Sequence, residues 1–166
     1  MTLAEHADAF YVDGSLRDLY VLNTTLEHWQ RMLDYVRGAG LVAGFERGTR
    51  TAQLPQRISD IFAEKDDPDH ESLLLRLNVG GLWVNCHFFQ DDEIEFDLDP
   101  REVTDEQRYE ALMGFMVDLG RATGRRVVMT PESSSGTAPG FVPLFDLPIG
   151  EQRPVYITEF GDRREA

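Results

Sequence analysis

The chain has 166 residues, 42% of them hydrophobic, and its 30 acidic against 16 basic residues give a formal net charge of -14. Such a charge repels phosphate backbones and anionic lipid, so we expect neither nucleic acid nor a membrane surface as a partner. Residues 1–8 carry acids where a signal peptide needs bases, and no apolar run approaches the ~18 residues of a membrane span.

The remaining global features predict one self-sufficient domain over residues 1–166. A chain of this length can bury a sizeable core without a metal, a cofactor or a disulfide. The single cysteine, Cys86, cannot form an internal bridge and lies in an apolar strand pattern. These features favour a reducing, cytoplasmic setting.

The first 60 residues predict a hairpin followed by a helix. Residues 10–22 contain two short apolar runs around Asp13-Gly14, a turn pair that is typical of hairpins. Thr24 and Glu27 then have the spacing of a capping box, which predicts a main helix over about 24–37. A short strand near 41–45 and a short helix after Pro55 follow.

Residues 72–99 predict a meander of three strands. Gly80-Gly81 tolerates the positive φ angles of a two-residue hairpin loop, so it fixes the register of the strands on either side. This register pairs Val79 with Leu82, Leu77 with Val84, Leu75 with Cys86 and Leu73 with Phe88. All eight residues are apolar, which agrees with one buried face.

The third strand of the meander alternates acids with apolar residues. Ile94, Phe96 and Leu98 share one face, because successive side chains of a strand point to opposite sides. A loop with an odd number of residues keeps them on the core side by placing Phe96 opposite Phe88. We therefore expect His87 opposite Asp97 and Asn85 opposite Asp99.

The last third of the chain predicts a second main helix over about 104–124 and a strand over 125–130. Residues 131–140 have the composition of a flexible loop. Two weaker strands, 141–145 and 154–160, precede a frayed, charged tail. Together these elements predict an α+β domain in which a largely antiparallel sheet packs one face against the two helices.

The polar face of the meander is the candidate functional surface. Two large aromatic side chains and a stripe of acids are expected there, and exposed aromatics of this size mark interaction sites unless residues 51–69 or the C-terminal tail cover them. We expect this face to bind a basic protein, with charge speeding the encounter and the aromatics supplying affinity. The candidate residues are Asp91, Asp92, Glu93, Glu95, Asp97, Asp99, Trp83, Phe89, His87, Asn85 and Arg76.

Other interpretations of the same face remain open. The chain contains no catalytic or phosphate-binding motif, which favours binding over catalysis. The main alternative is a small enzyme, or a ligand- or metal-binding protein, that uses His87, Asp97, Glu95 and Arg76 in a cleft. The acidic strand could also protect an exposed sheet edge from aggregation, and the aromatics could be buried in a homodimer rather than left free in a monomer.

In size, acidity, lack of catalytic motifs and α+β pattern, the chain resembles the immunity proteins that bacteria pair with polymorphic toxins. The resemblance is one of overall character along the whole chain, and no residue role is carried over from it. It implies that the protein neutralises a basic toxin, often a nuclease, by occluding the active site. The acidic face would then mimic the negatively charged substrate of the toxin.

Overall fold

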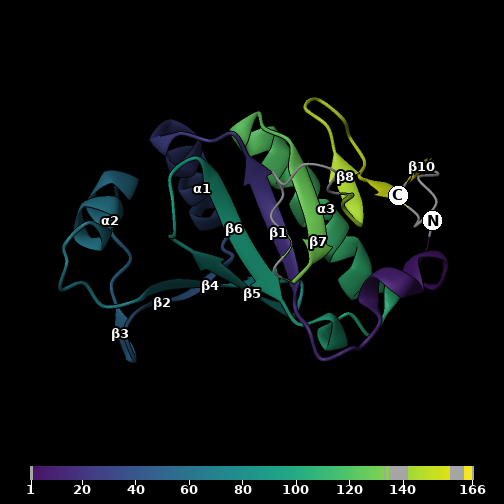
Figure 1. Ribbon diagram of the computed structural model, residues 1–166, viewed down its shortest axis with the longest axis horizontal. Helices are drawn as coiled ribbons and strands as arrows, with labels where there is room; N and C mark the ends of the chain where they lie inside the picture. Colours follow the sequence, from purple (N-terminus) through teal and green to yellow (C-terminus); the bar gives the residue numbers. More distant parts are fainter. Residues whose placement is uncertain (1, 133, 135–141, 158–162, 166) are drawn as a thin grey trace.

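Ten antiparallel strands form one sheet in the described part of the chain, and the main helices lie on one side of it (Figure 1). The computed structural model describes residues 2–132, 134, 142–157 and 163–165. The order of the strands across the sheet is β10-β9-β8-β7-β1-β6-β5-β4-β2-β3. Their bounds are β1 Arg17–Leu22, β2 Val42–Arg47, β3 Arg50–Ala52, β4 Leu73–Val79, β5 Leu82–His87, β6 Glu93–Leu98, β7 Val127–Pro131, β8 Phe145–Leu147, β9 Val155–Ile157 and β10 Arg163–Glu165. The helical segments are η1 Leu3–Phe10, α1 Leu26–Gly38, α2 Ile58–Lys65, η2 Pro100–Glu102 and α3 Glu106–Thr123.

The predicted α+β domain is confirmed, because α1 and α3 pack against the apolar face of the sheet. The two helices contact each other through Tyr35, whose ring stacks on Phe115 at 6.4 Å and whose hydroxyl donates to Asp118 at 3.3 Å. Their apolar sides join one continuous core with the inward residues of the strands. The buried members are Trp29, Met32, Leu33 and Val36 of α1, and Tyr109, Leu112, Met113, Phe115, Met116 and Leu119 of α3.

Helix α1 begins two residues later than predicted. The predicted range was 24–37 with Thr24 as cap, whereas the helix spans Leu26–Gly38 and Thr25 is its cap. The backbone N–H of Thr25 donates to His28 Nδ1 at 3.1 Å, so a histidine takes the place expected for a glutamate in the capping box.

Helix α3 also begins later than predicted. The predicted range was 104–124, whereas the helix spans Glu106–Thr123 and is capped by Asp105, whose carboxylate accepts from the backbone N–H of Arg108 at 2.9 Å. Gly124 ends the helix as predicted, because its φ of +67° is a conformation that glycine adopts without strain.

The first turn of the meander has the predicted register. Gly80 and Gly81 have φ angles of 59° and 93°, and β4 and β5 pair on either side of them. The pairs Val79–Leu82, Leu77–Val84 and Leu75–Cys86 are as expected, and all six residues are buried. The buried face of the meander was therefore predicted correctly from a two-glycine turn and an alternating pattern.

The predicted N-terminal hairpin is wrong. Residues 3–10 form η1, and β1 is a single strand in the middle of the sheet, where Val21 pairs with Ile94 of β6 and with Val127 of β7. The hairpin does not form because the chain before β1 is held by Arg17, a side chain with 3% exposure. Its guanidinium donates to the carbonyls of Ala9 at 2.7 Å and Tyr11 at 2.6 Å, where a hairpin arm would have paired with a strand.

The C-terminal third agrees with the prediction in part. Of the flexible loop expected at 131–140, Pro131 belongs to β7, Glu132 and Ser134 are described, and the rest lies outside the described residues. The tail is not wholly frayed, because β10 pairs with β9, with Arg163 opposite Ile157. Within the described part of the chain, no helix combines the length and apolarity needed to cross a membrane.

Candidate functional site

Four neighbouring strands present polar side chains on the sheet face opposite α1 and α3. The meander places Trp83, Asn85 and His87 on the same side as Glu93, Glu95 and Asp97, as the alternation predicted. The cross-strand register arranges them in two rows. The rows are Arg76–Asn85–Asp97–Asp18 and Leu74–His87–Glu95–Tyr20, each running through β4, β5, β6 and β1.

Sequence reasoning missed the contribution of β1 to this face. Asp18 lies opposite Asp97, and Tyr20 lies opposite Glu95. Asp18 and Tyr20 alternate with Leu19 and Val21, but this strand was predicted to belong to a hairpin within residues 10–22 and not to lie beside the acidic strand. Because β1 and β5 flank the acidic strand β6, that strand is central, and the interpretation of it as a protected sheet edge is wrong.

The register between β5 and β6 differs from the prediction by two residues. Asn85 lies opposite Asp97 rather than Asp99, and His87 lies opposite Glu95 rather than Asp97. A register shift of two residues keeps every side chain on its predicted face, because side chains of a strand point to the same side at every second residue. The alternation fixes the face but leaves the length of the connecting loop open.

The loop is fixed by its contacts with α1. The backbone carbonyl of Asp91 accepts from Thr24 Oγ1 at 2.7 Å and from Trp29 Nε1 at 3.1 Å, while the carbonyl of Asp92 accepts from the Thr24 N–H at 2.8 Å. The side chains of both aspartates are exposed, and Glu93 follows them at the start of β6 and accepts from Gln90 at 2.6 Å. The loop backbone is therefore anchored, whereas its acidic side chains point into solvent.

Asp97 joins the central residues of the face into one cluster. Its two carboxylate oxygens accept from Asn85 Nδ2 at 2.8 Å and from His87 Nε2 at 2.5 Å. Burial alone would raise the pKa of Asp97, but these two hydrogen bonds and the charge of His87 outweigh it and lower the pKa. Asp97 is thus held ionised, with both oxygens engaged.

The same contacts act on the histidine in the opposite direction. Burial would lower the pKa of His87, but the hydrogen bond to Asp97 and the charges of Asp97, Glu95 and Asp18 outweigh it and raise the pKa. The imidazolium form of His87 is therefore favoured to a higher pH than in a free histidine. His87 is the cation that partly balances the acids of this face.

Glu95 lies between these acids, and its negative charge is balanced less well by its neighbours than that of Asp97. Its pKa is raised by burial first, and then by the charges of Asp18, Glu93 and Asp97, while His87 lowers it. Burial, Asp18 and Glu95 together also raise the pKa of Tyr20 well above its usual range. A cation placed beside Glu95 would relieve this repulsion.

Asp99 and Arg76 lie at the margins of the cluster and have other partners. The carboxylate of Asp99 forms an ion pair with Arg101 at 2.5 Å and caps η2, which lowers its pKa. Arg76 forms an ion pair with Glu46 of β2 at 3.0 Å. Both are therefore engaged with neighbours outside the Asn85–His87–Asp97 cluster.

The two exposed aromatics of the candidate surface, Trp83 and Phe89, lie toward opposite ends of β5. Trp83 is 50% exposed at the start of the strand and Phe89 is 60% exposed beyond its end, which separates them by about 20 Å along an extended chain. Phe89 stacks on the ring of His87 with centroids 5.0 Å apart and an interplanar angle of 5°. They form two separate apolar spots that flank the acids, and both rings remain at least half exposed, although Lys65 of the segment 51–69 lines the same hollow as Phe89.

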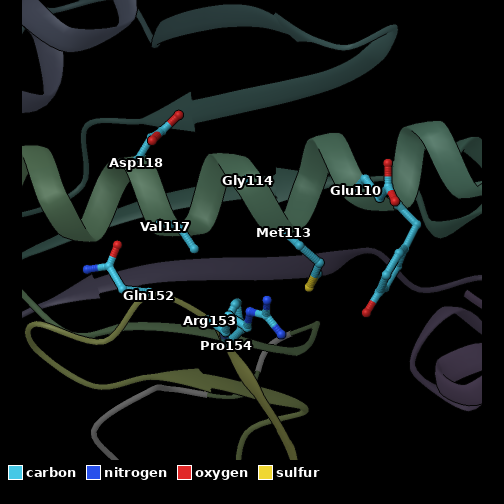
Figure 2. Close-up of a pocket in the computed structure, with 9 residues that line it drawn as sticks. Glu110, Met113, Gly114, Val117, Asp118, Gln152, Arg153 and Pro154 are labelled. Atoms are coloured by element: carbon cyan, nitrogen blue, oxygen red, sulfur yellow. The ribbon is translucent and has the colours of Figure 1, made fainter. Parts of the chain in front are cut away.

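Hollows in the surface lie beside this face and on the opposite side of the molecule. The larger, of about 480 Å³, lies on the helical side, where Met113 and Val117 of α3 face the segment Gln152–Pro154 (Figure 2). A second, of about 340 Å³, lies at the end of β5 and includes His87 among its lining residues. Of the four residues named for an enzyme or ligand-binding alternative, His87 is the one that lines it in the described part of the chain.

In the described part of the chain, the face offers neither a reactive thiol nor a metal-binding cluster. Cys86 points to the core, is fully buried, and has a pKa raised well above its usual value, so it is not a nucleophile for His87. Within the described residues, no group of three or more His, Cys, Asp or Glu side chains is placed to hold a metal ion. Comparison with protein-family models, curated proteins and solved structures gave no match to this chain.

Proposed function

We propose that this protein binds a basic partner protein through the acidic face. The observation that carries the proposal is the concentration of six carboxylates between positions 91 and 99, all of them at least partly exposed. They lie on the central strand β6, on the loop before it and, in the case of Asp99, directly after it, so they form one compact negative field. Such a field steers a cationic partner and accelerates association.

The repulsion among these acids favours a cationic partner. Glu95 has a raised pKa because it is partly buried near Asp18, Glu93 and Asp97. A guanidinium or ammonium group from the partner would stabilise its ionised form. Binding would then release protons at a pH near the pKa of Glu95, and affinity would rise as the pH increases through that pKa. Trp83 and Phe89 would supply apolar contacts at the two ends of the field.

We further propose that the partner is a toxin and that this protein is its immunity protein, acting in the cytoplasm. Size, acidity and the α+β pattern support this, together with the negative charge that would imitate the substrate of a basic nuclease. The chain has a single cysteine and thus no internal disulfide, which is in keeping with a reducing compartment.

The experiment mixes the purified protein with the product of the reading frame adjacent to its own gene. The expected result is loss of the toxic activity at equimolar protein. Full toxic activity at that ratio would refute the immunity proposal. A protein that is monomeric by light scattering at all concentrations would further exclude a homodimer that buries Trp83 and Phe89.

A pair of matched triple variants tests the acidic face itself. Asp91→Asn, Asp92→Asn and Glu93→Gln together remove three charges from the face, two of them on exposed side chains and the third, at Glu93, on a half-buried one. The control, Asp34→Asn, Asp60→Asn and Glu110→Gln, removes three exposed charges from α1, α2 and α3.

Both triple variants change the net charge equally, so only the position of the charges differs. The face variant should reduce the association rate at low salt about tenfold more than the control does. Equal rates for the two variants would refute the proposed location of the binding surface.

A further inference from the structure

A second site of different chemistry lies at the end of β5, beside the acidic face. A cavity of about 340 Å³ opens between this strand end and the segment that connects α2 to β4. Its walls are largely apolar and are formed by Leu73, Leu74, Phe88 and Phe89. Leu73 and Phe88 are buried, so these walls are fixed by the core. The size is at the lower end of the range for small-molecule sites.

Basic nitrogen groups gather around this apolar cavity. Lys65, the only lysine of the chain, lines it together with His70 and His87, two of the four histidines. Because the net charge of the chain is -14, three basic side chains around one small cavity form a local arrangement that differs from the rest of the surface. Positive charge beside apolar walls is the complement of a ligand with an anionic head and an apolar body.

Two of the acids that flank this cavity in the sequence are paired with arginines, while Asp66, Asp67 and Asp69 of the same segment are exposed. Glu64 forms a bidentate ion pair with Arg47 at 2.5 and 2.8 Å, and Glu71 pairs with Arg50 at 2.6 Å. Lys65 has a loose contact with Asp66 at 3.7 Å, and the Asp66 side chain is 75% exposed. A ligand carboxylate could therefore form a shorter ion pair with the Lys65 ammonium than Asp66 does.

We propose that this cavity binds a small organic carboxylate with an aromatic or aliphatic body. The carboxylate would pair with Lys65, near His70 and His87, and the body would lie against Leu74 and Phe89. The exposed ring of Phe89 would lose solvent contact on binding, which accounts for an apolar side chain that is 60% exposed in the free protein. This inference does not depend on the proposed binding of a basic protein.

The test uses three probes that share one body. Titration calorimetry with 3-phenylpropionate, its neutral amide and 3-phenylpropylamine separates the effect of charge from that of the ring. The carboxylate should bind at least about tenfold more tightly than the amide, because a charge-assisted ion pair is lost, and the amine should bind more weakly still. Equal binding of carboxylate and amide, or no binding of any probe at millimolar concentration, would overturn the proposal.

Variants locate the site. Lys65→Met keeps the length of the side chain but removes its charge, and should weaken binding of 3-phenylpropionate about tenfold. Arg31→Met on α1 removes one positive charge from an exposed side chain away from the cavity and should leave binding unchanged.

Phe89→Ser should also weaken binding, and the amide signals of Phe89 and His70 should shift on titration of the wild-type protein. Wild-type affinity in folded Lys65→Met, or shifts confined to other surfaces, would refute this assignment.

Discussion

Asp97→Asn is the substitution that tests the electrostatic organisation of the acidic face most directly. The wild-type carboxylate accepts from Asn85 and from His87, and both side chains of the ion pair are mostly buried, with 23% exposure for His87 and 15% for Asp97. An amide of the same shape removes the charge and presents its NH₂ group to one of the two donors. A charge-assisted hydrogen bond contributes about 1.5–3 kcal/mol to stability, so we expect a loss of about 2 kcal/mol while His87 is protonated.

The pH dependence of this loss follows from the two pKa shifts. The pKa of His87 is raised above its ordinary value of 6.5, so its stabilisation is complete below that value and is lost as the pH rises through the folded pKa. The pKa of Asp97 is lowered below 3.8, so its stabilisation is complete above that value and is lost as the pH falls through the folded pKa. The pair is therefore at full strength between these two ordinary values.

Urea unfolding followed by tryptophan fluorescence measures the effect. At pH 5, a loss of about 2 kcal/mol lowers the unfolding midpoint by about 1 M urea. At pH 9, a smaller share of His87 is protonated than at pH 5, and removing a charge relieves repulsion from Glu95 and Asp18, so the loss should fall to about 0.5 kcal/mol or less. In a His87→Gln background the two pH values should give the same loss. A loss that is equal at pH 5 and pH 9 in the wild-type background would refute the reasoning.

Three further predictions concern the core and the turns. Gly80→Ala should destabilise the protein by more than about 1 kcal/mol, because φ is +59° and an added Cβ would lie 2.4 Å from the Cβ of Ala111. Adding Ala111→Gly to the Gly80→Ala variant should restore the part of the stability that is lost through the clash with Ala111, as measured by the urea midpoint. A Gly80→Ala variant with the stability of the wild type would contradict the turn geometry. Cys86 should react with a thiol reagent at pH 8 only at the rate of unfolding, since its thiol is fully buried with a raised pKa; rapid labelling of folded protein would show otherwise. Trp83→Phe should abolish most acrylamide quenching of fluorescence with little change in stability, because Trp29 is fully buried and Trp83 is half exposed; quenching that persists would place Trp29 in contact with solvent.

The meander was predictable because two local signals agreed. The positive φ angles required at Gly80-Gly81 and the alternation on both sides of it point to one register. The next turn had only the alternation, which fixes the face of each residue but not the number of residues in the loop. Its true length depends on hydrogen bonds from Thr24 and Trp29 to the loop carbonyls, and these contacts join residues more than 60 positions apart.

The place of the N-terminal strand in the sheet was not predictable from the same rules, although the strand itself was expected within residues 10–22. Asp13-Gly14 forms a turn, with a φ of +90° at Gly14, but it leads into β1 from an irregular segment rather than from a second strand. Asp18 and Tyr20 of β1 alternate with Leu19 and Val21, but this alternation does not say which strands lie on either side. The polar cluster was therefore predicted without Asp18 and Tyr20, which complete it.

The central position of β1 also has a consequence for how this chain acquires its structure during synthesis. Strands β6 and β7 each pair with β1, so this first strand joins the two halves of the sheet. Yet β1 leaves the ribosome long before either partner has been translated. Val21 pairs with Ile94 and with Val127, which follow it by 73 and 106 residues in the sequence. Pairings so distant in sequence close slowly. An apolar strand that stays unsatisfied for most of translation is thus a point at which a nascent chain of this protein would depend on chaperones.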